Sequence, residues 1–176
     1  MYERVIAVAL DIFELTNELV KKYKTRDPFS LASSLGIDVD CADLGSLKGF
    51  YIVYSRNRFV VLNTSLTESL SRIILAHEIG HDRLHRSIAE NGGLKESSFF
   101  DMKSKPEMEA NVFAANLLIT DRNVIEYGDD GYTAEEMAKD LYIPYPLALI
   151  KINDMIKRGY ELNIPYVPKA EFLGAI

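Results

Sequence analysis

Apolar residues recur every three or four positions over residues 3–24, with polar residues between them. This period is typical of an amphipathic helix that packs on a domain along one face. A second, shorter helix is expected between Pro28, which suits the first turn of a helix, and Gly36, which can adopt the left-handed conformation that ends one. The sequence therefore predicts two helices ahead of any strand.

Three segments with strand character follow these helices. Residues 37–41 alternate apolar side chains with acids, and residues 49–54 and 58–62 are rich in β-branched and aromatic residues. Only residues 55–57 separate the last two segments, so we interpret them as an antiparallel hairpin. A small sheet is expected ahead of the central helix.

The helical period returns after this hairpin. Ser65 and Glu68 match a capping box, and apolar residues continue the period through about His85. Residues 86–104 show no clear period, so we expect a long loop there. A strong helical pattern then follows over residues 106–118.

Three short helices are expected near the C-terminus, over residues 121–127, 133–141 and 146–158. Thr133 and Glu136 match a second capping box at the start of the middle one. The last two helices are joined by a tight turn and resemble a helix-turn-helix. The basic residues of the final helix lie late in it, however, which suits contact with DNA poorly.

The order of these segments indicates the α+β class. We expect a small β-sheet packed on the central helix and on the helix over residues 106–118, with a C-terminal helical pair added to them. Residues 1–125 are expected to form the principal domain, including the N-terminal helix. Residues 126–176 are expected to form a helical region packed on it, so that the chain is one compact unit.

Composition and charge narrow the possible partners. The chain has 48% hydrophobic and 26% charged residues, as an ordinary globular protein does. Its formal net charge is −6 and its basic residues form no cluster longer than a pair, so nucleic acid is not the expected partner. No apolar run approaches the roughly 20 residues of a membrane span, and acidic residues interrupt the N-terminal apolar stretch. We therefore expect a cytoplasmic protein without a membrane partner.

Cys41 is the only cysteine of the chain. An intramolecular disulfide is therefore impossible, and a zinc site made of several thiolates is excluded. Any metal site has to use histidine and carboxylate ligands.

The strongest chemical signal is the sequence HEIGH at residues 77–81, within the central helix. Residues four apart lie on one helix face one turn apart, so His77 and His81 can bind one zinc ion together. Glu78 lies about 100° further round the helix, where it can reach a water molecule on that zinc and act as the general base. Apolar residues precede the motif, so the histidines are expected at a buried surface. The competing interpretation is an exposed helix end with two solvated histidines.

A catalytic zinc site needs a third protein ligand and an open position for water. His85 continues the same helix face, but three successive turns of one straight helix cannot converge on one metal ion. Glu107 and Glu109, on the next strong helix, are the other candidates. Glu107 shares a face with Asn111, which can hydrogen-bond and orient a ligating histidine, so we favour Glu107. Glu109 stays the alternative, because Glu107 could instead form a capping box with Ser104.

The two helices resemble those of the ImmA/IrrE metallopeptidases, which are zincins of the thermolysin-like branch with a glutamate as third zinc ligand. The family's two signature helices are similar in order, spacing and residue types to HEIGHDRLH and then EMEANVFAANLL of this chain. The preceding VVLNTSL fits the family as well. The resemblance is close over residues 49–120 and general elsewhere. It implies a zincin-like fold in which His77, His81 and Glu107 hold one Zn²⁺ ion and Glu78 is the catalytic acid and base.

The resemblance also implies a substrate class. Family members are intracellular bacterial or phage proteins that cut a helix-turn-helix repressor, commonly encoded beside them, and so induce mobile-element or stress genes. We therefore predict a zinc-dependent endopeptidase whose protein substrate is a helix-turn-helix repressor of a mobile element or stress regulon. The alternatives are a zinc-containing antirepressor that binds its partner without cutting it, and a purely structural zinc with four protein ligands.

Two features depart from the family's pattern. The second signature helix usually ends in a Leu-Leu-Met-Pro-like sequence, but here Ile119 and Thr120 follow the two leucines. Asp82 stands where an apolar residue is common, and we expect it either to be exposed or to bind a neighbouring cation. The sequence does not single out one residue that stabilises an oxyanion. The candidates are Tyr51, Tyr54, His85 and Tyr132.

Overall fold

A computed structural model describes residues 2–90 and 104–165 of the chain. Its strands are β1 (Asp38–Ala42), β2 (Gly49–Tyr54) and β3 (Asn57–Asn63). Its helices are α1 (Tyr2–Tyr23), α2 (Pro28–Leu35), α3 (Glu68–Leu84), α4 (Arg86–Glu90), α5 (Lys105–Leu118), α6 (Asp121–Asp129), α7 (Ala134–Asp140) and α8 (Tyr145–Lys157). These elements confirm the predicted α+β class.

The sheet has three strands in the order β1-β3-β2, so β3 is its central strand. β2 and β3 form the predicted antiparallel hairpin, in which Tyr54 pairs with Asn57. Ser55 and Arg56 make the turn with φ angles of 49° and 68°, the left-handed conformation that tight hairpins require. β1 runs parallel to β3 on its other side.

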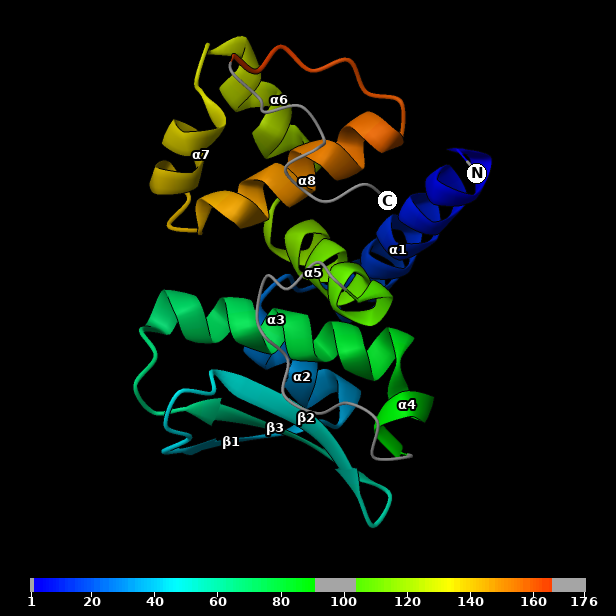
Figure 1. Cartoon of the computed structure of the whole chain (residues 1–176), viewed down its shortest axis with the longest axis vertical. Helices are drawn as coiled ribbons and strands as arrows, with labels where there is room; N and C mark the ends of the chain where they lie inside the picture. Colours follow the sequence, from blue (N-terminus) through cyan, green and yellow to red (C-terminus); the bar gives the residue numbers. More distant parts are fainter. Residues whose placement is uncertain (1, 91–103, 166–176) are drawn as a thin grey trace.

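Layers of helices cover one side of this sheet (Figure 1). α3 lies across the sheet, α5 packs on α3, and α8 lies beyond α5. α1 packs beside α5 and also reaches α8, while α2 packs against α3 and β1. α5 is therefore in contact with α1, α3 and α8, and it joins the sheet side of the molecule to the C-terminal helices.

Several helix ends follow the predicted local chemistry. Asp27 caps α2 by accepting the backbone N–H of Ser30, and Gly36 ends that helix with a φ angle of 69°. Thr133 and Glu136 form the predicted reciprocal capping box of α7. These elements therefore begin and end where short-range hydrogen bonds dictate.

Two local predictions were wrong. Thr67 rather than Ser65 caps α3, because the helix begins at Glu68 and the side chain of Thr67 accepts the backbone N–H of Leu70. Ser65 lies in the preceding turn, where its backbone N–H bonds to the side chain of Asn63. Residues 86–90 form α4 instead of the start of a loop, and five residues are too few to show a helical period in the sequence. The remainder of the predicted loop, residues 91–103, lies outside the described residues.

The buried apolar side chains form one cluster that includes residues of α1, the sheet, α3, α5 and α8. The division of the chain at residue 125 stays a prediction. In the parts of the chain that the structure describes, we find no helix that is both long enough and apolar enough to cross a membrane.

The backbones of α3 and α5 approach closely at Gly80. A Cβ atom added to Gly80 would lie 3.0 Å from Cα of Ala110, 3.2 Å from its carbonyl oxygen and 3.3 Å from Cβ of Phe113. Ala110, which is fully buried, provides the small side chain of α5 at this contact. The absence of a side chain at residue 80 therefore allows the two helices to touch.

Gly80→Ala tests this contact. In this variant, helix propensity should raise the free energy of unfolding and crowding between the helices should lower it. Alanine favours a helix interior over glycine by about 1 kcal/mol. Overpacking costs about 1–3 kcal/mol, so we expect a net loss in the free energy of unfolding, measured by urea denaturation. A more stable variant would show that the helices can separate without cost.

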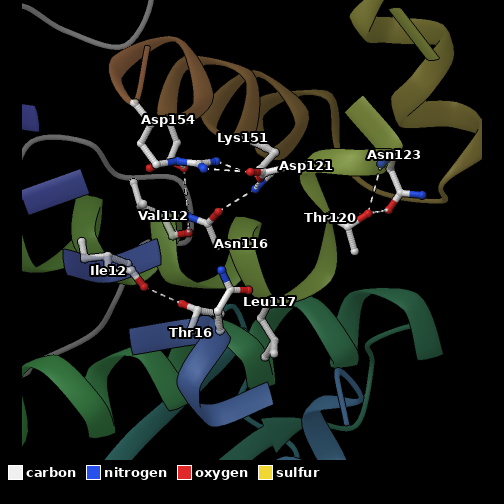
Figure 2. A network of polar contacts seen from close by, with 12 residues as sticks. Ile12, Thr16, Val112, Asn116, Leu117, Thr120, Asp121, Asn123, Lys151 and Asp154 are labelled. Carbon is white, nitrogen blue, oxygen red and sulfur yellow. Dashed lines mark hydrogen bonds and ion pairs between the residues drawn. The ribbon is translucent and has the colours of Figure 1, made fainter. Parts of the chain in front are cut away.

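A buried network of charged side chains connects α5 to α6 and α8 (Figure 2). The amide of Asn116 accepts a hydrogen bond from Lys151 (2.6 Å) and donates one to Asp154 (3.2 Å). Lys151 also contacts Asp121, and Arg158 contacts Asp121 and Asp154 at 2.8 and 2.9 Å. The two cations balance the two carboxylates. Because Lys151 is 1% exposed, it is a structural residue of this network rather than a surface charge.

Lys151→Met tests the importance of this balance. Removing one partner from a buried network leaves a carboxylate without compensation, and we expect the free energy of unfolding to fall by about 3 kcal/mol. Lys139→Met is the matched control, because Lys139 lies on α7 with its side chain 73% exposed and forms an ion pair with the exposed Glu135. Urea denaturation of both variants measures the difference, and equal losses would contradict the structural role of Lys151.

Candidate metal centre

His77 and His81 lie on α3, one turn apart, with their rings turned toward each other. Their Nε2 atoms are 3.1 Å apart and the ring planes are inclined at 82°. Each residue is 1% exposed. The helical spacing therefore brings two imidazole nitrogens to one point inside the protein, which is where the sequence predicted them.

Glu107 reaches this point from the first turn of α5. Its Oε2 atom is 3.2 Å from Nε2 of His77, and its Oε1 atom is 3.3 Å from Nε2 of His81. The backbone N–H of Glu107 bonds to the side chain of Ser104, which caps α5. The two interpretations of Glu107 in the sequence are therefore compatible, since the backbone takes part in the cap while the side chain faces the histidines.

Within the described residues, His77, His81 and Glu107 form a group that could hold a metal ion, with their ligand atoms within 4.8 Å of one another. Two imidazoles and one carboxylate are a ligand set that suits zinc. Three protein ligands also leave the fourth coordination position of zinc for a non-protein ligand, as a catalytic zinc site requires. Their convergence makes this group the candidate metal centre.

The chemistry of the donor atoms fits a cation at this centre. Nδ1 of His77 lies 2.9 Å from the amide oxygen of Asn111, which can only accept, so Nδ1 carries the hydrogen and Nε2 keeps a lone pair when the ring is neutral. Oε2 of Glu107 is buried and accepts no hydrogen bond from the described residues. Acceptors that face one another without a proton between them repel, and a metal ion removes that repulsion.

Glu107 is a charged ligand rather than a neutral one. Burial acts to raise the pKa of its carboxyl group. Where Nε2 of His77 and of His81 carries a hydrogen, the hydrogen bonds to Glu107 and the charge of the imidazoles outweigh burial and lower that pKa to about 2. The carboxylate is therefore ionised at any pH at which histidine can bind a metal ion.

Glu109 lies apart from these three donors. Its Oε2 atom is 2.9 Å from Nε2 of His85, and its Oε1 atom is 3.4 Å from Lys105. His85 ends α3 and is 5% exposed, with its pKa lowered mainly by burial and partly restored by Glu109. The geometry thus brings Glu107, and not Glu109, to the histidines of the HEIGH sequence.

Glu78 is buried on α3, where it is 2% exposed. It follows His77 directly and precedes His81 by three residues. Its role as the general base stays a prediction.

The candidates for an oxyanion donor are scattered. Tyr51 donates its hydroxyl hydrogen to Asp82 (2.8 Å), and burial together with that hydrogen bond raises the pKa of the phenol. Tyr54 is 70% exposed, and Tyr132 stacks edge-on against Tyr127 at a centroid distance of 5.1 Å. None of these contacts singles out one tyrosine for that role.

Asp82 is 1% exposed, so of the two expectations for this residue, exposure is wrong and contact with a neighbouring cation is confirmed. Its carboxylate accepts a hydrogen bond from the hydroxyl of Tyr51. It also forms ion pairs with Arg58 (3.3 Å), Arg83 (2.6 Å) and Arg86 (3.1 Å). The neighbouring cations are arginines of the same protein. One carboxylate thus ties the end of α3 to β2, β3 and the start of α4.

Comparison with known proteins identifies the family. The family described as Peptidase_M78, the IrrE N-terminal-like domain, matches residues 32–153, which include all of α3 and α5. The chain belongs to this metallopeptidase family, and the resemblance found in the sequence is confirmed. It is also similar to "Uncharacterized immunity region protein 2" of Bacillus phage phi105, at 37% identity over 134 residues, which cover 76% of this chain and 84% of that protein.

Glu107→Gln tests the third ligand. The amide keeps the size of the side chain but loses the negative charge that favours a divalent cation, so we expect zinc affinity to fall by at least about 100-fold. Chelator competition measures the dissociation constant of zinc. Glu109→Gln provides the comparison, and we expect its loss of zinc affinity to be smaller than that of Glu107→Gln, because Glu109 contacts His85 rather than the donor group. A greater loss in the Glu109 variant would mean that the assignment of Glu107 is wrong.

Proposed function

We propose that this protein is a zinc-dependent endopeptidase that cleaves a helix-turn-helix transcriptional repressor. The convergence of His77, His81 and Glu107 on one buried point is the observation that supports the proposal most directly. Membership of a metallopeptidase family supports the same reaction class. One Zn²⁺ ion, held by these three side chains, is the cofactor.

Glu78 is the residue to which we assign the proton transfers. When bound, zinc supplies a Lewis acid that polarises the scissile carbonyl and lowers the pKa of a water molecule toward neutrality. Glu78 takes the proton of the attacking water and later delivers it to the departing amine. Asn111 keeps the ring of His77 oriented through the 2.9 Å hydrogen bond, so that Nε2 faces the ion.

The substrate class is supported by the family and by charge. The relative in Bacillus phage phi105 carries the name of an immunity region protein, and the family that this chain resembles is known for cutting repressors encoded beside its members. A DNA-binding repressor has a basic surface, and this chain has a formal net charge of −6. Opposite net charges speed the encounter of two proteins. A repressor encoded next to this protein is therefore the substrate that we propose.

Glu78→Gln is the decisive variant for catalysis. The glutamine keeps the volume of the side chain but cannot accept a proton, so we expect zinc affinity within about twofold of wild type and cleavage slower by about 10²–10⁴-fold. Zinc content is measured by elemental analysis, and cleavage of the neighbouring repressor is followed by mass spectrometry. Glu126→Gln, an exposed substitution on α6, is the control and should match the wild type.

The other outcomes separate the competing functions. A Glu78→Gln variant that binds zinc and cuts as fast as wild type would show that Glu78 is not the general base. Binding of the repressor by wild type and variant, with cleavage by neither, would establish an antirepressor. A site in which X-ray absorption finds four protein ligands on the zinc would point to a structural metal.

A further inference from the structure

Two residues beside the candidate metal centre form a continuous line of contacts to one of its ligands. Oε2 of Glu109 is 2.9 Å from Nε2 of His85, and Nδ1 of His85 is 3.2 Å from Nδ1 of His81. His81 in turn presents Nε2 to Nε2 of His77 and to Glu107. The side chains of Glu109 and His85 are 13% and 6% exposed, so water competes little for these contacts.

The negative charge of Glu109, at one end of this line of contacts, sets the direction of each hydrogen bond in it. The carboxylate of Glu109 can only accept, so Nε2 of His85 must carry a hydrogen. A neutral imidazole has one N–H group, and Nδ1 of His85 is then an acceptor. The facing Nδ1 of His81 must therefore carry the hydrogen of that bond, which leaves the lone pair of His81 on Nε2, the atom that faces Glu107.

The opposite arrangement is unfavourable. If Nδ1 of His85 carried the hydrogen, Nε2 would present a lone pair to the carboxylate of Glu109 at 2.9 Å. Two buried acceptors at that distance repel each other, and each loses a hydrogen bond. Nε2 of His81 would then carry the hydrogen and could not bind a metal ion. The charge of Glu109 therefore selects the tautomer of His81 through His85.

The backbone fixes the positions from which these side chains act. His85 ends α3, and its backbone N–H donates to the carbonyl of His81 at 2.9 Å. Glu109 lies two residues beyond Glu107 on α5, so one helix turn supplies a carboxylate to the donor group and a second carboxylate to His85. The packing of α3 against α5 thus sets both contacts at once.

We propose that Glu109 and His85 are positioning residues, which hold His81 in the tautomer and orientation that present the Nε2 lone pair to the metal ion. Neither residue touches the ion. The proposal rests on the proposed function to the extent that His81 is a zinc ligand. It assigns to Glu109 a role different from that of Glu107, although both carboxylates come from the same turn of α5.

The experiment compares three variants of the full chain. His85→Leu removes the acceptor, and Glu109→Gln removes the charge that selects the tautomer. In both, we expect the dissociation constant of zinc to rise by about 10–100-fold, because losing such a partner of a ligating histidine costs that much affinity. His85→Asn places an amide oxygen near the position of Nδ1, so it should recover at least half of the loss on a logarithmic scale.

A spectroscopic measurement separates tautomer control from simple support of the fold. Long-range ¹H–¹⁵N correlation spectra of the metal-free proteins report which imidazole nitrogen of His81 carries the hydrogen. We expect Nδ1–H in the wild type and in His85→Asn, and a mixture of tautomers in Glu109→Gln. Lys105→Ala, which removes only the exposed ion-pair partner of Glu109, is the control and should keep wild-type zinc affinity.

The results that would overturn this proposal differ from those that would overturn the proposed function. Wild-type zinc affinity and an unchanged His81 tautomer in both His85→Leu and Glu109→Gln would exclude tautomer control while leaving the peptidase intact. A lower thermal midpoint with unchanged zinc affinity would also exclude it and leave only a structural role. Failure of the wild type itself to bind zinc would refute the proposed function, and the positioning role with it.

Discussion

The close approach of α3 to α5 at Gly80 is the constraint on which the candidate metal centre depends. Two of its donors lie on α3 and the third lies on α5, so their mutual distances are set by the separation of two helices rather than by either helix alone. Metal–ligand distances tolerate errors of only about 0.2 Å. Gly80 lies between the two histidines, and its contact with Ala110 fixes the separation of the helices at the point where that accuracy matters.

The far side of α5 is held by different chemistry. Apolar packing against α1 and α8 has little directional preference, but the hydrogen bonds of Asn116 to Lys151 and Asp154 do. A rotation of α5 about its axis would move Asn116 away from both partners and expose buried charges to an apolar environment. The network therefore resists a rotation that would carry Glu107 away from the histidines. The C-terminal helices in this way contribute to a centre that contains none of their residues.

Much of the fold and of the candidate centre could be predicted from the sequence because those features are local. The spacing of His77 and His81 places them on one face of any helix, and the sequence predicts the shared face of Glu107 and Asn111 in the same way. The pairing of His85 with Glu109 could not be predicted from the sequence. Periodicity shows which face of its own helix a residue occupies, but not which residue of another helix lies opposite it. The sequence also allowed Glu107 to be a capping residue. In the structure its backbone N–H bonds to the Ser104 cap, while its carboxylate lies beside His77.

The burial of Asp82 was missed for a related reason. An acid within a helix is normally placed at the surface, and its burial is favourable only when cations surround it. Arg58, on β3, and the hydroxyl of Tyr51, on β2, come from the sheet, and only tertiary structure brings them to α3. Gly80 was overlooked in the same way. Within the motif it reads as a small residue that is tolerated in a helix, whereas the structure makes it the contact with α5.

The two imidazoles of the candidate centre share a feature that explains why they converge so closely. Each is attached to the protein at two points, the backbone and the group at its Nδ1 atom. This group is Asn111 for His77 and His85 for His81. The Ser104 cap fixes only the backbone of Glu107. An imidazole with one nitrogen bonded has little freedom left in its ring torsion, so its other nitrogen points in a fixed direction. The entropy of ordering these side chains is therefore lost when the protein folds, and binding an ion does not require it again.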